Sequence, residues 1–352
     1  MENKQEDTKN TPKVNLSLKK NLFSRTLVAL VLIIIIIPCA ILGDYVYLAL
    51  IFCLSAICCH EVIMAPQSIN HRYKSIIYIF AYLMMFSLVF WLILKDNLDY
   101  FLESQRLGTE FIFDLKRGFD SPQISIMAFF ISILFFFLMV MLDKNFTIND
   151  AFYFITMLFV VSFGFQCILF LRYFPFVDAA KAGMDSTTDN FKYLTSALLV
   201  IFVVAADCLF DVGAYLVGSM LGKHKMCPRI SPKKTWEGFI GGFIFSVVFS
   251  CLTGYLLAYF GHPLLSFFDL AHWWNILILA LVIPFTATFG DLIFSTVKRN
   301  FQIKDFGFIL KSHGGMLDRV DSIIFSCIAA SLLLVAMSNN WLIFLWYINY
   351  AF

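Results

Sequence analysis

The stretch LTSALLVIFVVAADCLFDVGAYLVG, residues 194–218, decides the class of fold. It is long enough to cross the hydrocarbon core of a bilayer as a helix, which takes about 20 predominantly apolar residues. It nevertheless contains Asp207 and Asp211, which lie four residues apart and therefore on one face of a helix. A carboxylate inside such a span is costly and usually faces a protein interior or a water-filled cavity. The stretch therefore predicts a membrane helix that carries part of a polar site.

The remainder of the chain has the same apolar character. Of 352 residues, 60% are hydrophobic and 14% are charged, against roughly 45–50% apolar and 25% charged in soluble domains. We therefore expect an all-α, polytopic integral membrane protein with about nine transmembrane helices. The expected spans are residues 26–42, 45–60, 76–94, 123–142, 151–171, 194–218, 236–260, 274–294 and 322–347, with a tight hairpin at Gly43-Asp44. The net charge of +2 gives no basic field that would favour a nucleic-acid partner.

The positions of the basic residues predict the orientation, because cytoplasmic loops are enriched in Lys and Arg. Basic residues concentrate in the N-terminal tail, between Lys223 and Lys234, and between Lys298 and Arg319. These positions place the N-terminus in the cytoplasm. We expect a disordered cytoplasmic tail over 1–22, about five transmembrane helices over 23–193 and a C-terminal transmembrane catalytic region over 194–352. Segments 95–122 and 172–193 are expected to be loops on the outer side.

Acidic residues gather at the expected cytoplasmic ends of the last spans. Asp291 is followed at helical spacing by Ser295, Lys298 and Arg299, and Asp318 and Asp321 begin the ninth span. Any one of these charges is equally well explained as a helix-terminal charge near the membrane surface. Together they favour a phosphate-metal site, because carboxylates and bound phosphates ligate Mg²⁺, and Lys and Arg bind phosphate.

Two loops add candidate ligands. Ser231-Pro232-Lys233-Lys234-Thr235-Trp236-Glu237-Gly238 is expected to open the seventh helix, where free backbone N–H groups bind anions. Taken alone, this segment is better explained as a plain capping sequence with interfacial Lys and Trp residues. His313-Gly314-Gly315 precedes the ninth span, where paired glycines allow close backbone approach to a ligand. A tight turn beside an interfacial histidine is the alternative.

The C-terminal segments closely resemble the signature of the CDP-diacylglycerol synthases, also called phosphatidate cytidylyltransferases. The resemblance rests on Ser295-Thr-Val-Lys298-Arg299, Lys304-Asp305-Phe-Gly307 and His313-Gly314-Gly315-Met-Leu-Asp318-Arg319-Val-Asp321, and upstream on Asp211-Val-Gly-Ala-Tyr215 and the Ser231–Gly238 segment. It covers roughly residues 207–322. Lys311-Ser312 stands where the family usually has Pro-Gly.

The resemblance implies that CTP and phosphatidate react to CDP-diacylglycerol and pyrophosphate. It further implies a multi-pass protein of the cell (inner) membrane, with a cytoplasmic active site, Mg²⁺, a possible second cation and a homodimeric state. The residues carried over comprise a catalytic group (Asp291, Lys298, Arg299, His313, Asp318 and Arg319), a substrate-binding group (Ser231, Lys234, Thr235, Ser295, Lys304, Gly314 and Gly315) and a metal-binding group (Asp211, Asp291, Asp318 and Asp321).

Three other functions remain open. A cytidylyltransferase or a CTP-dependent kinase that acts on an isoprenoid lipid would use similar machinery. An ion-coupled transporter also has many spans and intramembrane acids, but it is expected to carry those acids near the centres of its spans. A phosphatidate acceptor agrees best with the motif.

Overall fold

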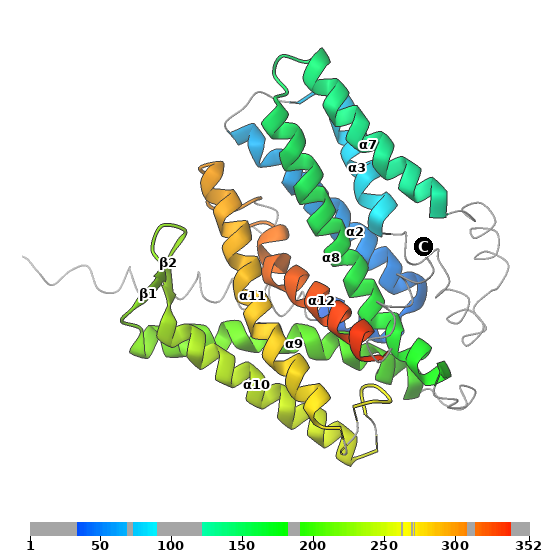
Figure 1. The fold of residues 1–352 in the computed structure, drawn as a ribbon, viewed down its shortest axis with the longest axis vertical. Helices are drawn as coiled ribbons and strands as arrows, with labels where there is room; N and C mark the ends of the chain where they lie inside the picture. The colour runs from blue at the N-terminus through cyan, green and yellow to red at the C-terminus, as the bar shows by residue number, and fades with distance from the viewer. Residues whose placement is uncertain are drawn as a thin grey trace, which may run out of the picture.

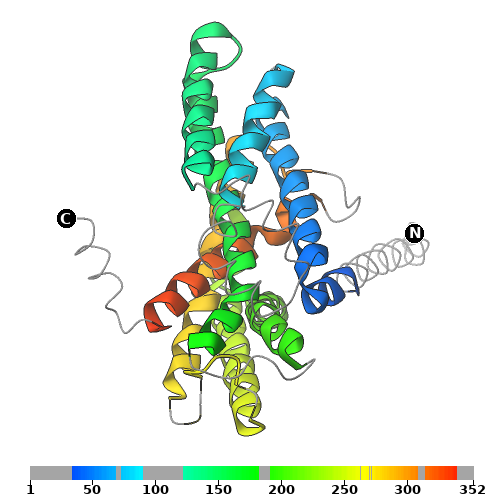
Figure 2. The same ribbon diagram turned by 90° about the vertical axis from the view of Figure 1, so that its right-hand side faces the viewer.

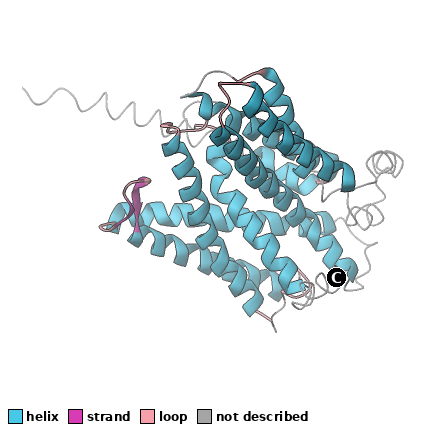
Figure 3. Cartoon of the chain, turned by 45° about the horizontal axis from the view of Figure 1, so that its top comes forward, coloured by secondary structure: helices cyan, strands magenta, loops and turns pink. Residues whose placement is uncertain are grey.

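The computed structural model describes residues 34–68, 73–89, 122–181, 191–261, 263–268, 270, 272–307 and 314–338. These residues are helical apart from one short β-ribbon and connecting turns (Figures 1 and 3). The elements are α2 (Asp44–Met64), the 3-10 helix η1 (Pro66–Ser68), α3 (Ser75–Val89), α7 (Pro122–Leu142), α8 (Ile148–Lys181), α9 (Phe191–Leu221), β1 (Lys225–Cys227), β2 (Ser231–Thr235), α10 (Trp236–Tyr259), α11 (Trp274–Asn300) and α12 (Leu317–Ser338).

Six of the described helices are long and apolar enough to cross a membrane, and two shorter apolar segments, Ser75–Val89 and Met127–Leu142, accompany them. The expected helical membrane architecture is confirmed for this part of the chain. Every expected span from the second onward overlaps a described helix. The first span is described only over 34–42, which is helical; Gly43 then breaks the helix with φ 70° and ψ −147° before α2 begins. The expected tail (1–22) and most of the 95–122 loop lie outside the described residues.

The loop expected over 172–193 is wrong in its first part, because α8 continues through Pro175 to Lys181. A proline removes one helical hydrogen bond, which membrane helices tolerate when neighbouring groups satisfy the freed backbone. Arg172, which the sequence suggests as a loop charge, is 1% exposed inside this helix. Its guanidinium donates to the carbonyls of Ala40 (2.6 Å) and Ile41 (3.3 Å). The arginine therefore holds the end of the preceding helical segment.

α8 is the central helix of the described fold. It contacts α2, α3 and α7 on one side and α9 and α12 on the other, while α10 packs on α9 and α11 (Figures 1 and 2). Its buried side chains include Phe154, Val161 and Phe165, each 0% exposed. The N-terminal helices and the last four helices thus share one core, which keeps the two halves of the chain in direct contact.

α9 and α10 lie side by side because small residues line their contact (Figure 1). A Cβ atom added to Gly242 would lie 2.5 Å from the Phe210 carbonyl oxygen, so only glycine fits there. Ser246 Oγ donates to the Ala206 carbonyl at 2.8 Å. Small residues and interhelical hydrogen bonds are the usual means by which membrane helices associate. This close packing fixes Asp207 and Asp211 of α9 relative to the start of α10.

The Ser231–Gly238 segment opens α10 at the expected position, Trp236, but its first five residues form a strand that the sequence does not predict. Ser231–Thr235 forms strand β2, which pairs antiparallel with β1, and the helix begins at Trp236. The Thr235 hydroxyl accepts a hydrogen bond from the Gly238 N–H at 3.2 Å, so Thr235 caps α10. The ribbon projects from one end of the α9–α10 pair (Figure 3).

Candidate functional site

Lys298 of α11 lies between two carboxylates of α12. Its ammonium is 2.9 Å from Asp318 Oδ1 and 3.6 Å from Asp321 Oδ2. All three side chains are about nine-tenths buried or more. Helical spacing places Asp318 and Asp321 on the same face of α12, as the sequence predicts, and the close packing of α11 against α12 brings Lys298 to them.

Lys234 of β2 pairs with Asp291 of α11 at 2.5 Å. The other oxygen of Asp291 accepts a hydrogen bond from Ser295 Oγ, one helical turn further along, at 3.1 Å. Both charged side chains remain roughly a quarter exposed. This pair brings the two sequence motifs together: the Ser231–Gly238 segment and the segment that begins at Asp291.

The two aspartates of α9 have different surroundings although they share a face. Asp207 is 1% exposed and accepts hydrogen bonds from Ser322 Oγ (2.9 Å) and Ser326 Oγ (2.5 Å) of α12. Asp211 is exposed and interacts electrostatically with Asp291, Lys234 and Arg319. Asp211 therefore belongs to the open part of the site, whereas Asp207 belongs to its buried wall.

The turn before α12 is organised by Asp318. Asp318 Oδ2 accepts hydrogen bonds from the backbone N–H groups of Phe306 (2.8 Å) and Gly315 (2.9 Å). Gly314 has φ 79°, a left-handed conformation that favours glycine. The conformation of the turn therefore explains the paired glycines. Asp318 accepts hydrogen bonds from this turn and also forms the ion pair with Lys298.

Glu61 of α2 is a site residue that the sequence reasoning missed. It is 2% exposed, and its two oxygens accept hydrogen bonds from the N–H groups of Met316 (2.9 Å) and Leu317 (2.7 Å) at the start of α12. An acidic residue at the end of an apolar span is the signal that identifies Asp291, and Glu61 carries the same signal. Asp207 was also recognised from the sequence, but it was not assigned to the site.

Other expected site residues lie at the edge of this cluster or beyond it. Arg299 is exposed and donates to the carbonyls of Ile230 (3.3 Å) and Ile303 (3.4 Å), so it braces the ribbon against the loop after α11. Lys304 is exposed, and Ser231 pairs with Cys227 in the ribbon. His313 lies outside the described residues, as does Lys311.

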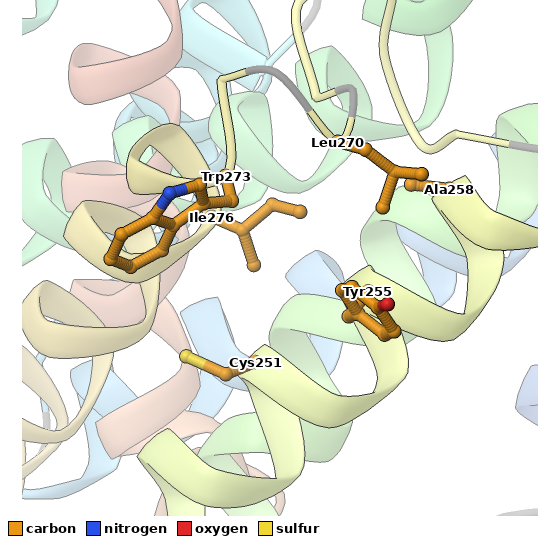
Figure 4. A pocket seen from close by; sticks show the side chains of 6 residues that line it. All are labelled: Cys251, Tyr255, Ala258, Leu270, Trp273 and Ile276. Atoms are coloured by element: carbon orange, nitrogen blue, oxygen red, sulfur yellow. The ribbon is translucent and has the colours of Figure 1, made fainter.

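A cavity of about 390 Å³ opens beside the Lys234–Asp291 pair. Its walls combine polar and apolar side chains, among them Asp211, Lys234, Thr235, Phe210, Tyr215 and Phe239. A second cavity, of about 510 Å³, lies near the other end of α10 and is lined by Cys251, Tyr255, Ala258, Leu270, Trp273 and Ile276 (Figure 4). The first cavity has the charges that a phosphate ester needs, together with apolar walls that suit a lipid; the second is lined by uncharged side chains.

The charges of the cluster fit a divalent cation. Four carboxylates, those of Asp211, Asp291, Asp318 and Asp321, interact with three cations, Lys234, Lys298 and Arg319, and a fifth carboxylate, that of Asp207, lies near Asp291 and Asp321. This excess of oxygen donors is the chemistry that Mg²⁺ prefers. Among the described residues, no three acidic, histidine or cysteine side chains yet gather around one point that could hold a metal ion. Asp291 and Asp318 are instead engaged by lysines.

Comparison with known proteins agrees with this chemistry. Residues 23–337 match the profile of the Cytidylyltransferase family. A protein of Staphylococcus haemolyticus named phosphatidate cytidylyltransferase is 36% identical over 178 residues, which are 47% of this chain and 62% of that protein. Proteins of the same name from Staphylococcus saprophyticus and Staphylococcus aureus are 35% and 36% identical over 46% of this chain and 61% of their own length. The chain thus spans less than two thirds of the length of these relatives.

Proposed function

This chain belongs to the cytidylyltransferase family, and on that premise we propose that it is a phosphatidate cytidylyltransferase, which converts CTP and phosphatidate to CDP-diacylglycerol and pyrophosphate. The observation that carries the proposal is the joining of three motifs at one site: Lys234 of β2 pairs with Asp291 of α11, and Lys298 of α11 pairs with Asp318 of α12. A site with several lysines and carboxylates at the end of membrane helices suits a reaction between a lipid phosphate and a nucleotide triphosphate.

In the proposed reaction, a phosphate oxygen of phosphatidate attacks the α-phosphorus of CTP. The new P–O bond forms while the bond from the α-phosphorus to the bridging oxygen breaks, and pyrophosphate leaves with that electron pair. A phosphate monoester has a second pKa of about 6, so phosphatidate near neutral pH is largely dianionic and needs no protein base. Catalysis then consists of positioning and charge stabilisation.

The chain's own cations supply that stabilisation in the proposal. Lys234 lines the cavity and is positioned to exchange its Asp291 partner for a phosphate oxygen. Lys298 and Arg319 neutralise further phosphate charge, and the exposed Arg299 and Lys304 extend the basic surface. Ser231, Thr235, Ser295, Gly314 and Gly315 complete the proposed substrate site. His313 is proposed to position phosphate rather than to abstract a proton.

Mg²⁺ is the proposed cofactor, and a second cation is compatible with the same carboxylates. Asp211, Asp291, Asp318 and Asp321 are the proposed ligands, and Asp207 is the buried neighbour that adds negative charge. A bound ion of this kind would neutralise the charge that develops on the phosphate oxygens. When Lys234 and Lys298 bind phosphate oxygens in place of their present partners, the carboxylates of Asp291 and Asp318 become available to the metal ion.

We further propose nine transmembrane helices with a cytoplasmic N-terminus, a cell-membrane location and a cytoplasmic site. The end of α11, the start of α12 and the ribbon meet at the site. These are the segments whose Lys and Arg content predicts the cytoplasmic side. A homodimer is proposed from the family resemblance alone. Labelling of Lys225→Cys and Lys304→Cys by a membrane-impermeant maleimide, each in a chain whose nine native cysteines are replaced by serine, would test the orientation, since both positions should react only from the inner side.

The activity is tested with the purified chain in detergent, phosphatidate, Mg²⁺ and CTP labelled at the α-phosphate. We expect the label to enter a chloroform-soluble lipid as pyrophosphate is released, and we expect chelation of the metal by EDTA to stop both. The Asp291→Asn variant should fold like the parent, judged by its melting temperature, but should lose most of the activity.

Polyprenyl phosphate offered in place of phosphatidate separates the acceptor classes. Preferential labelling of the polyprenyl lipid would assign the enzyme to an isoprenoid acceptor. Transfer of the γ-phosphate of CTP instead of the cytidylyl group would identify a kinase. Folded protein that transfers neither group would contradict the proposal.

A further inference from the structure

We propose that Glu61 is a positioning residue: its carboxylate fixes the first turn of α12 and thereby the positions of Asp318 and Asp321. The effect on turnover rests on the cytidylyltransferase activity proposed above, whereas the effect on the turn can be measured without it. The proposal gives the N-terminal helices a defined part in a site whose sequence motifs all lie in the C-terminal half.

The hydrogen bonds of Glu61 go to groups that a helix cannot satisfy itself. The first N–H groups of a helix have no intrahelical partner, and those of Met316 and Leu317 each donate to one oxygen of Glu61. Hydrogen bonds to an ionised carboxylate are stronger than neutral ones, and the positive end of the helix dipole favours the anion. α2 therefore supplies the N-terminal cap of α12.

Gly307 and Gly315 pack directly against the Glu61 carboxylate. A Cβ atom on Gly315 would lie 2.6 Å from both Glu61 oxygens, and one on Gly307 would also overlap the carboxylate. A side chain at either position would displace Glu61 or the backbone. Gly315 thus has a reason of its own to be glycine, beyond the approach to a ligand that its place in the motif suggests.

The residues whose N–H groups bind Glu61 are directly next to the acidic cluster in the sequence. Asp318 directly follows Leu317, and its Oδ2 accepts the Gly315 N–H of the same turn. Glu61 and Asp318 therefore hold consecutive N–H groups, those of residues 315, 316 and 317, between two carboxylates from different helices. A shift of this turn moves Asp318 away from Lys298.

A second contact fixes the start of the same connection. Ser68 Oγ of η1 lies 3.1 Å from the Phe301 carbonyl oxygen, just beyond the end of α11, and 2.8 Å from the Ala65 carbonyl oxygen, and its single proton can be donated to either one. The N-terminal helices thus contact both ends of the segment between α11 and α12. Of these two contacts, the one through Glu61 reaches the residues beside Asp318.

Glu61→Gln, Glu61→Asp and Tyr153→Phe, each in the full chain, test the proposal. Glutamine replaces one acceptor oxygen by an NH₂ group that opposes a backbone N–H. We expect kcat to fall about 100-fold, as for a displacement of about 1 Å in a reacting group, while the KM for CTP stays within about threefold because ground-state binding is retained. Glu61→Asp keeps two acceptor oxygens and should recover part of kcat.

Hydrogen–deuterium exchange of the peptide 314–322 provides the second measurement. Exchange should be faster in Glu61→Gln and unchanged in Tyr153→Phe. Tyr153 is the matched control because its hydroxyl donates to the carbonyl of Val62, next to Glu61, at 3.0 Å, and phenylalanine keeps the ring that packs on Phe301. If Glu61→Gln does not fold, Glu61→Asp carries the same comparison.

The possible results are decisive. Parent kcat in Glu61→Gln, a lower kcat without faster exchange in 314–322, or an equal loss in Tyr153→Phe would each overturn the proposal. A parent chain without cytidylyltransferase activity would refute the proposed function instead, and exchange in Glu61→Gln would then decide the positioning role alone.

Discussion

Lys234 and Asp291 form an ion pair with a separation of 2.5 Å. The pair joins the ribbon before α10 to the C-terminal part of α11, which we propose to lie on the cytoplasmic side. The pair is partly exposed and borders the cavity with apolar and polar walls. It therefore places a cation where we propose that a lipid phosphate and a nucleotide meet, and it gives the first of four predictions.

Replacement of Lys234 by alanine should lower kcat/KM by roughly 10- to 100-fold, because one charge-assisted hydrogen bond to phosphate is lost. Lys225→Ala is the matched control, since Lys225 is exposed on the other strand of the ribbon. Steady-state kinetics with labelled CTP measures both variants. Equal activity of the two would remove Lys234 from the substrate site.

Lys298→Met should destabilise the fold, because it leaves the largely buried carboxylates of Asp318 and Asp321 without their shared cation. Breaking one side of a buried ion pair typically costs about 3–5 kcal/mol. The double variant Lys298→Met/Asp321→Asn should recover part of that loss. Unfolding in detergent measures the cycle, and additive effects of the two changes would show that Lys298 and Asp321 are not coupled.

Thr235→Ala should lower the free energy of unfolding by about 1 kcal/mol, the usual value of a helix N-cap. Thr235→Ser should restore it, because serine keeps the oxygen that accepts the Gly238 N–H. Thermal unfolding of the two variants checks this expectation. A serine variant as unstable as the alanine variant would indicate that the threonine methyl group, packed near Gly222, is what matters.

The carboxyl group of Asp143, which lies outside the membrane helices, should make the stability of the fold depend on pH. Its pKa is lowered by the hydrogen bond from the Asn145 N–H and by the Lys74 ammonium, which lies 3.1 Å away. A lowered folded-state pKa gives a stabilisation that is complete above the ordinary aspartate pKa of about 3.9 and is lost as the pH falls through the lower folded value. Asp143→Asn should therefore melt below the parent at neutral pH.

That difference in melting temperature should shrink as the pH falls below the ordinary aspartate pKa of about 3.9 and should disappear below the lowered pKa of Asp143 in the folded chain. A scan of melting temperature against pH for both proteins measures it. A difference that persists unchanged into acid would mean that the asparagine acts through shape rather than charge.

Much of the helical order followed from the sequence. The helices α7, α10 and α11 begin within one residue of the expected spans that start at 123, 236 and 274. The ends were predicted less well: α8 passes Pro175 and the expected loop at 172, because buried Arg172 finds backbone carbonyls inside the fold. The ribbon was not expected, since three to five residues of β structure leave no periodic signal.

The site was predicted in part. Helical spacing predicts that Asp291 lies beside Ser295 and that Asp318 and Asp321 share a face, whereas the packing of α11 on α12 brings Lys298 to these two acids. Arg299 donates instead to the carbonyls of Ile230 and Ile303. The metal-binding and substrate-binding roles of these residues remain predictions. Glu61 could not be assigned from the sequence, because its partners are the backbone N–H groups of Met316 and Leu317.

The sequence by itself determined that the chain forms apolar helices and that its acids and lysines concentrate at the ends of the last spans. Hydrophobic length and helical periodicity are local properties, so they can be read along the chain. Only the tertiary structure decided that Glu61 caps α12 and that Lys234 meets Asp291. Contacts between distant segments depend on how the helices pack, and a backbone N–H presents the same chemistry whatever side chain its residue carries.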